Sequence, residues 1–469
     1  HDPLRRQRQM CIRDRVTLPE INQSMGADKE CYARWLDFPG HQLISQVEVE
    51  IGGQRIDRQY GDWMQIWNQL TSSAEQARGY AKMVGNTTQL TYITDPSFAD
   101  VNGPCGGEAP VNVCAPRNAL PETTLYIPLQ FWYCRNPGLA LPLIALQYHE
   151  VKINLDLRPI DECLWAMNSI KDCSGNQQST TAYNQSLVAA SLYVDYIFLD
   201  TDERRRMAQN PHEYLIEQLQ FTGDESVGSS SNKIKLNFNH PCKELIWVVQ
   251  PDANVDYCSS YVCGELLFKV LGAQPFNYTD AVDALPNAVH AFGGPTQTGS
   301  ANPNNETPAP GNADVIADGA FQDAVANDIL ADAGVVDSGV SDAGTFVLAE
   351  TALDMHCWGL NPTVVAKLQL NGQDRFSERE GTYFDQVQPW QHHTRAPDTG
   401  INVYSFALRP EEHQPSGSCN FSRIDNATLQ VVLSNATVAG TNTAKVRVYA
   451  TNYNVLRVMS GMGGLAYSN

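Results

Sequence analysis

Long apolar runs and charged side chains are both scarce in this 469-residue chain, of which 18% is charged and 42% hydrophobic. No stretch approaches the roughly 20 consecutive apolar residues that a transmembrane helix needs. The richest stretch, residues 138–151, is interrupted by Pro142, Gln147 and His149. The whole chain has 33 glycines and 26 prolines, which is close to average usage and excludes collagen-like and wholly disordered chains. The sequence therefore predicts a globular protein of two or three domains without a transmembrane segment.

Basic side chains are also scarce, since 32 Lys and Arg stand against 52 Asp and Glu, for a formal net charge of −20. Such a surface repels phosphate backbones, so direct binding to nucleic acid is not expected. The excess of acidic over basic residues is greatest between Lys269 and Lys367, where twelve acidic residues and no Lys or Arg occur. Residues 271–350 are rich in Ala, Asp, Asn, Gly and Pro, and we expect them to form an acidic surface loop.

Motifs for metal, cofactor or nucleophile chemistry are missing. None of the twelve cysteines forms a C-x-x-C pair, so free thiols are favoured over a disulfide framework or a zinc site. His149-Glu150 and His212-Glu213 lack the second histidine of a zinc-protease motif, and His392-His393 has no accompanying ligand cluster. The sequence therefore predicts no catalytic residue, no metal site and no cofactor.

The first fifteen residues differ in character from the rest. They contain five Arg and two Asp and show no strand alternation. Residues 1–15 resemble the conceptual translation of a sequencing adapter, and we expect them to be an artefact, with natural sequence beginning near Val16. The alternative is a basic N-terminal arm.

Alternation of apolar and polar residues with period 2 dominates the remaining chain. Such alternation places one face of a strand on a core and the other in water. The clearest runs are residues 47–51, 153–157, 234–238, 368–370 and 446–448. Helical periodicity is limited to three short segments, residues 62–70, 202–210 and 318–330. We therefore expect an all-β chain with few helices.

An internal similarity indicates that one β-domain occurs twice. Residues 49–57 and 368–376 each form a strand, then a glycine turn at Gly53 or Gly372, then a Gln and an Arg before an aromatic segment. This order predicts that Gly53 and Gly372 occupy matching turns.

The similarity continues along both halves. A strand, a turn and a second strand follow, with the turn at Pro137-Gly138 in the first copy and at Pro415 and Gly417 in the second. Proline presets φ and glycine permits positive φ, which suits both turns. The repeat predicts one domain over residues 16–210 and another over residues 211–469.

Two segments of the sequence resemble a known protein family. Residues 131–151, which begin Phe-Trp-Tyr-Cys-Arg-Asn-Pro-Gly, and residues 452–469 at the C-terminus resemble major capsid proteins of nucleocytoplasmic large DNA viruses, closest to those of algal viruses. Further matching segments are residues 51–57, 195–200, 211–220, 370–376 and 419–428. The resemblance extends over nearly all of residues 47–469 except the acidic stretch.

The resemblance implies a double jelly roll, two eight-stranded β-sandwiches in one chain, of which three copies form a trimeric, pseudo-hexagonal capsomer of an icosahedral shell. Family members carry strands before the segment that matches residues 46–57, so we expect the first jelly roll to lack its N-terminal strands. An exposed sheet edge would then favour aggregation.

The predicted function is structural: the major capsid protein of a virion, assembled in the host cytoplasm, and not an enzyme. Its expected partners are further copies of the chain, neighbouring capsomers and minor capsid proteins, with a host receptor or glycans as further possibilities. Asn277 and Asn305, in sequons of the expected surface loop, are candidate glycosylation sites. The alternative is a tandem jelly-roll protein that binds or cleaves carbohydrate, which a cleft of paired carboxylates and exposed aromatic residues would favour.

Overall fold

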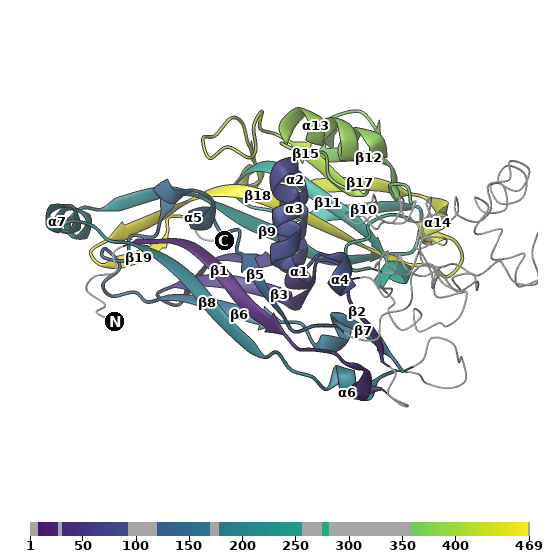
Figure 1. Cartoon of the computed structure of the whole chain (residues 1–469). Helices are drawn as coiled ribbons and strands as arrows, with labels where there is room; N and C mark the ends of the chain where they lie inside the picture. The colour runs from purple at the N-terminus through teal and green to yellow at the C-terminus, as the bar shows by residue number, and fades with distance from the viewer. Residues whose placement is uncertain are drawn as a thin grey trace, which may run out of the picture.

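The computed structural model describes residues 8–26, 31–91, 120–168, 178–255, 274–280 and 359–467. These residues form two β-sandwiches with a pair of helices between them (Figure 1). Within this part of the chain, no helix has the length and apolar character that crossing a membrane demands.

The second sandwich contains two four-stranded arrays that pack face to face. One array has the order β9-β18-β11-β15 and the other the order β10-β17-β12-β13, all neighbours antiparallel. The strands are β9 (His212–Val227), β10 (Ser231–Leu236), β11 (Pro241–Pro251), β12 (Thr363–Leu370), β13 (Gln373–Asp374), β15 (Ile401–Ser405), β17 (Ala427–Leu433) and β18 (Ala444–Met459). Three short strands extend these sheets: β14 (Arg379–Glu380), β16 (Cys419–Asn420) and β19 (Met462–Leu465).

The first sandwich repeats this arrangement. Its sheets have the orders β8-β1-β5 and β6-β3-β4, which match β18-β11-β15 and β17-β12-β13 strand for strand in the same chain order. The strands are β1 (Arg8–Leu18), β3 (Ile44–Ile51), β4 (Gln54–Tyr60), β5 (Thr123–Pro128), β6 (Val151–Leu157) and β8 (Ala189–Ile197), with a separate pair β2 (Tyr32–Trp35) and β7 (Leu164–Met167). The expected duplication of one β-sandwich is therefore confirmed by strand connectivity.

Matching hairpins show how local sequence sets this topology. In β3, Val47, Val49 and Ile51 are fully buried and the alternating glutamates point away from the core. The hairpin β3–β4 turns through Gly52 and Gly53 with φ of 60° and 80°, and β12–β13 turns through Asn371 and Gly372 with φ of 51° and 79°. Two consecutive positive φ values define the tight hairpin turn that glycine and asparagine favour. Gly53 and Gly372 thus occupy matching turns, as predicted.

The second pair of predicted turns is equivalent in topology but not in conformation. Pro137-Gly138 lies between β5 and β6, and Pro415 and Gly417 lie between β15 and β17, the corresponding connections. Gly417 has a φ of 146°. Gly138 does not adopt a positive φ, because it lies in a 3-10 turn capped by Asn136, whose Oδ1 accepts a hydrogen bond from the Gly138 N–H at 2.9 Å. The apolar run after this turn is buried irregular chain instead of the expected strand, since β6 begins only at Val151.

The first strand corrects one expectation about the N-terminal residues. β1 runs from Arg8 to Leu18 and pairs with both β5 and β8, although residues before Val16 showed no strand alternation in the sequence. Val16 and Leu18 lie in the core of the first sandwich. Among the described residues, this sandwich has no counterpart of β9 or β10. The adapter origin of residues 1–15 stays a prediction, and sequencing the gene with its flanking DNA tests it.

Helices occupy the connections between strands. They are α1 (Pro39–Leu43), α2 (Gly61–Thr71), α3 (Ala74–Val84), α4 (Thr88–Thr91), α5 (Trp132–Arg135), α6 (Thr180–Tyr183), α7 (Thr201–Gln209), α13 (Gln388–His392) and α14 (Asn435–Val438). α2 and α7 correspond to predicted helices, and α7 joins the two sandwiches. α3 was not predicted, and residues 318–330 lie outside the described part of the chain. Five cysteines of the described part are free thiols, as expected for those positions.

The start of the expected acidic surface loop is buried instead. Residues 274–280 pack between the sandwiches, where the rings of Phe276 and Phe38 lie 5.9 Å apart and Tyr278 joins the same apolar cluster. Two aromatic side chains within seven residues explain this burial, because each removes a large apolar area from water. Residues 281–350 lie outside the described part, so their position at the surface stays a prediction.

Candidate functional site at the junction of the two sandwiches

The junction between the sandwiches has an apolar centre. Successive side chains of β11 face opposite sides of the sheet. Leu245 and Trp247 face the core of the second sandwich. Ile246 and Val248 face outward, toward the first sandwich. All four are buried, so the strand appears in the sequence as a continuous apolar run. α2 covers the outward face, and Trp67 belongs to the same buried cluster as Ile246.

Aromatic rings extend this centre. Tyr449 of β18 stacks on Phe221 of β9 with ring centroids 4.8 Å apart, and Trp63 of α2 lies 5.6 Å from Tyr449. Tyr60, the last residue of β4, meets Phe221 edge to face at 5.0 Å. Large aromatic contacts of this kind dominate the energetics of protein interfaces. The two sandwiches therefore share one buried aromatic cluster.

A carboxylate at the rim of this centre is shared between the halves. Asp57 of β4 is buried and accepts hydrogen bonds at 3.0 Å from the backbone N–H of Leu219 in β9 and from that of Arg58. Burial raises the pKa of Asp57 to about 7, although these hydrogen bonds act in the opposite direction. Gln218 donates to the backbone oxygen of Ile56 in the same contact. These bonds fix β4 and β9 in register.

A second carboxylate, Asp62 of α2, holds two arginines from different sandwiches. Its Oδ1 lies 3.2 Å from Nη2 of Arg158, and its Oδ2 lies 2.9 Å from Nη1 of Arg447 in β18. Burial alone would raise the pKa of Asp62, but the two guanidinium groups lower it below its usual range. Asp62 therefore stays ionised and ties α2 of the first sandwich to β18 of the second.

Glu217 of β9 forms the centre of a third ionic group. Its Oε2 accepts from Nη2 of Arg135 at 2.8 Å, and its Oε1 lies 2.8 Å from Nζ of Lys243. The Lys243 side chain is fully buried and also donates to the backbone oxygen of Pro410 at 2.6 Å. Arg135 belongs to α5 of the first sandwich and its guanidinium lies over the Trp67 ring, 4.6 Å from the centroid. Glu217 thus neutralises one cation from each half.

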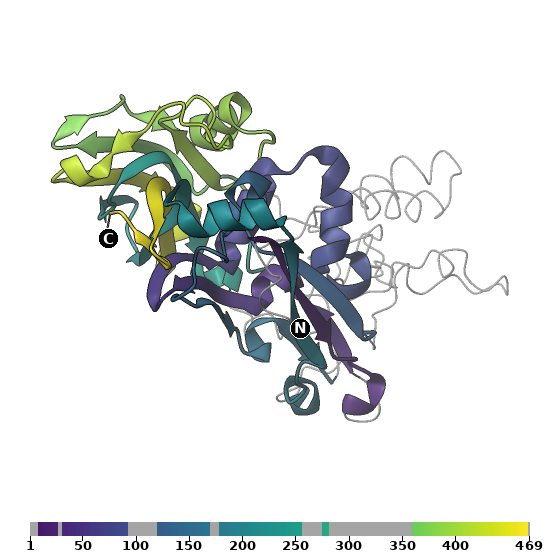
Figure 2. The ribbon, with the colours of Figure 1, turned by 90° about the vertical axis from the view of Figure 1, so that its left-hand side faces the viewer.

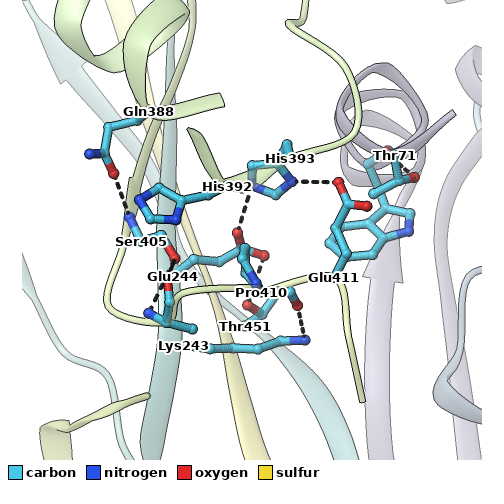
Figure 3. Close-up of polar contacts among 12 residues, drawn as sticks. Thr71, Lys243, Glu244, Gln388, His392, His393, Ser405, Pro410, Glu411 and Thr451 are labelled. Atoms are coloured by element: carbon cyan, nitrogen blue, oxygen red, sulfur yellow. Dashed lines mark hydrogen bonds and ion pairs between the residues drawn. The ribbon is translucent and has the colours of Figure 1, made fainter. Parts of the chain in front are cut away.

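The adjacent group places His393 between two carboxylates (Figure 3). Nε2 of His393 lies 3.0 Å from Oε2 of Glu244, and Nδ1 lies 3.0 Å from Oε1 of Glu411. Thr451 donates to the other Glu244 oxygen at 3.1 Å. Burial alone would lower the pKa of His393, but Glu244 and Glu411 raise it to about 9. The imidazolium therefore anchors the loop after α13 to β11.

The contacts of His393 with Glu244 and Glu411 make the stability of the protein depend on pH in the alkaline range. Because the folded pKa of His393 is raised above its ordinary value of 6.5, its stabilisation is complete below pH 6.5 and is lost as the pH rises through about 9. We expect the thermal unfolding midpoint to fall between pH 7 and pH 10, and this fall to shrink in the variant His393→Asn. The matched control His392→Asn should keep the wild-type slope. An equal slope in all three proteins would contradict the assignment.

Four carboxylates of the junction hold cations from different segments in place. Glu217, Glu244, Glu411 and Asp62 are each paired with a cation, so none is a free acid or base. The described residues contain no group of three or more His, Cys, Asp or Glu side chains that could hold a metal ion. A cavity of about 410 Å³ beside β4 and β9 is lined by a single carboxylate, that of Asp57, so the paired carboxylates expected of a carbohydrate enzyme do not occur in it.

The predicted turn residues are not part of the junction, whereas Asn277 lies in the segment buried between the sandwiches. Gly53, Gly372, Pro137, Gly138, Pro415 and Gly417 all lie in strand connections, where they shape the backbone. Asn277 is only 3% exposed, and its Oδ1 accepts hydrogen bonds from the N–H and hydroxyl of Thr279. This corrects its expected surface position, because an enclosed amide is not accessible for glycan attachment in the folded chain. Asn305 lies outside the described residues.

The junction residues were missed in the sequence, where His392-His393 indicated only a loop pair. A usable signal was Lys243-Glu244, two charges at the start of the apolar run in β11. Charged residues are almost never fully buried unless paired. That rule predicts partners for Lys243 and Glu244, but the partners lie far away in the chain.

Family models match nearly the whole chain. Residues 203–464 match the model described as large eukaryotic DNA virus major capsid protein, and residues 8–200 match the model described as major capsid protein N-terminus. The chain is 77% identical over 460 residues to the major capsid protein of Phaeocystis pouchetii virus, covering 97% of this chain and 86% of the relative. It is 70% identical over 513 residues to that of Chrysochromulina ericina virus, covering 97% and 88%.

A solved structure supports the same relationship. PBCV-1 VP54 superposes with a TM-score of 0.58 at 31% sequence identity, covering 99% of this chain and 91% of that chain. The expected fold, two tandem jelly-roll sandwiches, and the family resemblance of the two sequence blocks are both confirmed. With the duplicated topology and the matches to both family models, the chain belongs to the major capsid protein family of the large eukaryotic DNA viruses.

Proposed function

We propose that three copies of this chain associate into a pseudo-hexagonal capsomer, and that such capsomers form the icosahedral shell of a large DNA virus. The observation that carries the proposal is the duplication: two sandwiches of the same strand order, locked side by side by buried aromatic and ionic contacts. A threefold ring of such pairs would place six similar units around one axis, with one interface repeated three times. The chain's work is then self-association, not catalysis.

The partners beyond the capsomer follow from the same role. Neighbouring capsomers and minor capsid proteins would contact the sides of the ring, and assembly would take place in the host cytoplasm. The acidic residues 281–350 would face outward, where a host receptor or glycans could meet them, and like-charge repulsion would keep particles apart.

The mass of the recombinant protein in solution tests whether three copies associate into a capsomer. Size-exclusion chromatography with light scattering should give three times the chain mass of 51.8 kDa. Many modest contacts, each repeated by symmetry, suit assembly that corrects its own errors. A mass of one or two chains at all concentrations would contradict the proposal.

A further inference from the structure

One end of the first sandwich contains a cavity of about 210 Å³. It lies where β1 ends, between the segment of β2 and the turn that follows β6. The end of β1 lies beside α6 at the lower tip of the molecule (Figure 1), and it stays in the lower part of the turned view, away from the green and yellow segments (Figure 2). All residues that line the cavity belong to the first sandwich.

Backbone hydrogen bonds hold the walls of this cavity together. The N–H of Leu36 donates to the backbone oxygen of Cys163 at 2.9 Å, and the N–H of Arg158 donates to that of Leu43, also at 2.9 Å. Two lining residues, Leu157 and Ser186, are exposed, so the cavity opens to solvent beside them. The cavity is therefore preformed and accessible, as small-molecule sites usually are.

The walls are mostly apolar and offer no free charge. Burial raises the pKa of the Cys163 thiol to about 12, so this group stays neutral. The guanidinium of Arg158 binds Asp62 and Gln42, neither of which lines the cavity. The Arg158 stem can still cover apolar surface. The apolar lining residues are Pro19, Trp35, Leu43, Leu157, Ile160 and Leu187.

Trp35 adds a hydrogen-bond donor to this apolar lining. Its side chain is 1% exposed, and its Nε1–H has no acceptor among the described residues. A buried N–H without an acceptor costs free energy, because it has lost its hydrogen bond to water. An oxygen atom of a bound molecule would restore that bond.

The second sandwich provides an internal comparison, since it has a cavity of about 490 Å³ at the equivalent place. β1 corresponds to β11 and β8 to β18, and both cavities lie where the first strand of each pair ends and shortly before the second begins. The second cavity is lined by polar groups, among them Asp252, Asp280 and Thr443. The strand order therefore explains the space, and only the sequence of the first sandwich explains its apolar walls.

The same comparison shows that the cavity does not depend on the N-terminal strands. The described part of the first sandwich has no counterpart of β9 or β10. In the second sandwich, no residue of β9 or β10 lines the equivalent cavity. Strands at the corresponding place in the first sandwich would therefore leave this cavity open.

We infer that the cavity binds one compact, neutral, apolar molecule with an oxygen acceptor, such as an alcohol or ketone with a short hydrocarbon chain. Its oxygen would accept a hydrogen bond from Nε1 of Trp35, and its chain would contact the apolar walls. An apolar cavity of about 150 Å³ already accepts benzene, so the volume is sufficient. A carboxylate would find no unpaired cation there, because the Arg158 guanidinium is already bound.

Such a ligand has a consequence for the particle. A molecule that binds only the folded chain raises its stability by mass action. Binding would therefore raise the unfolding temperature of each chain. This inference goes beyond the proposed function and does not depend on trimer formation, so the two can fail separately.

Titration of the full chain with 2-octanone by isothermal calorimetry tests the inference. We expect saturable binding at one site per chain. Trp35→Phe should weaken this binding by about fivefold, the factor for one neutral hydrogen bond. Trp390→Phe is the matched control, because Trp390 is 79% exposed and does not line the cavity. It should bind 2-octanone as the wild type does.

Filling the cavity provides a second test. Leu157 is 39% exposed, so Leu157→Trp can place a larger side chain at the opening without overpacking the core. We expect this variant to lose 2-octanone binding and to keep the wild-type circular dichroism spectrum. The ketone should raise the unfolding temperature of the wild type alone. No saturable binding to the wild type up to the solubility limit of 2-octanone would overturn the inference, and so would equal affinity in Trp35→Phe or in a folded Leu157→Trp.

Discussion

Replacing Glu217 with glutamine is expected to lower the free energy of unfolding by about 3–5 kcal/mol, the usual cost of removing one partner from a buried ionic group. Glu217 neutralises both Arg135 and Lys243 at 2.8 Å. The Lys243 side chain is fully buried, so without the carboxylate its positive charge would remain away from water beside a second cation. The loss would also loosen the junction, because Arg135 and Lys243 belong to different sandwiches.

Glu213→Gln provides the matched control on the same strand. Glu213 pairs with Arg457 at 2.8 Å, but both side chains are about half exposed. Exposed ion pairs contribute only about 0–1 kcal/mol, since water and salt screen them. Urea unfolding followed by tryptophan fluorescence should therefore separate the two variants clearly. Equal midpoints for Glu217→Gln and Glu213→Gln would show that the buried group does not hold the junction.

The substitution Gly381→Ala is expected to destabilise the second sandwich at or above the upper end of the about 1–3 kcal/mol of ordinary overpacking. The added Cβ would collide with the backbone oxygen of Thr363, and a backbone atom cannot rotate away as the end of a side chain can. The start of β12 would have to move, and with it the helical residues 381–392.

Alanine variants of two further glycines serve as comparisons for Gly381→Ala. Gly61→Ala should have a similar effect in the first sandwich, since its Cβ would collide with the backbone oxygens of His41 and Ile44. Gly79 lies in α3 with no atom near its Cβ position, so Gly79→Ala should stabilise the helix by about 1 kcal/mol. Thermal unfolding of the three variants measures all three effects. A neutral Gly381→Ala would contradict the expected collision with Thr363.

The strands and their turns could be predicted because both depend on neighbours in the sequence. Val47, Val49 and Ile51 alternate with glutamates, so one face of β3 had to meet a core. Gly53 and Gly372 follow their strands at the same distance, and a tight hairpin turn needs the positive φ that they supply. The Phe-Trp-Tyr-Cys-Arg-Asn-Pro-Gly block carried the family resemblance for the same reason, since it is contiguous.

The junction could not be predicted because its partners are distant in the chain. Asp62 meets Arg447 and Glu244 meets His393 only after both sandwiches have formed. Asn277 was expected at the surface because its neighbourhood is polar, but Phe276 and Tyr278 draw the segment into the junction. The local sequence contains both the polar residues that favour exposure and the aromatic residues that favour burial. It does not show whether an apolar surface formed by distant residues will bury the segment.

By itself, the sequence determined the all-β class, the doubling of one strand order and the family, because alternation, turn residues and contiguous motifs are local properties. Only the tertiary structure decided which charges are buried, which helix covers which sheet, and which tryptophan is left without cover. The physical reason is that burial is a property of pairs of surfaces. Trp67 and Trp390 have the same side chain, but Trp67 is buried against the neighbouring sandwich and Trp390 is 79% exposed.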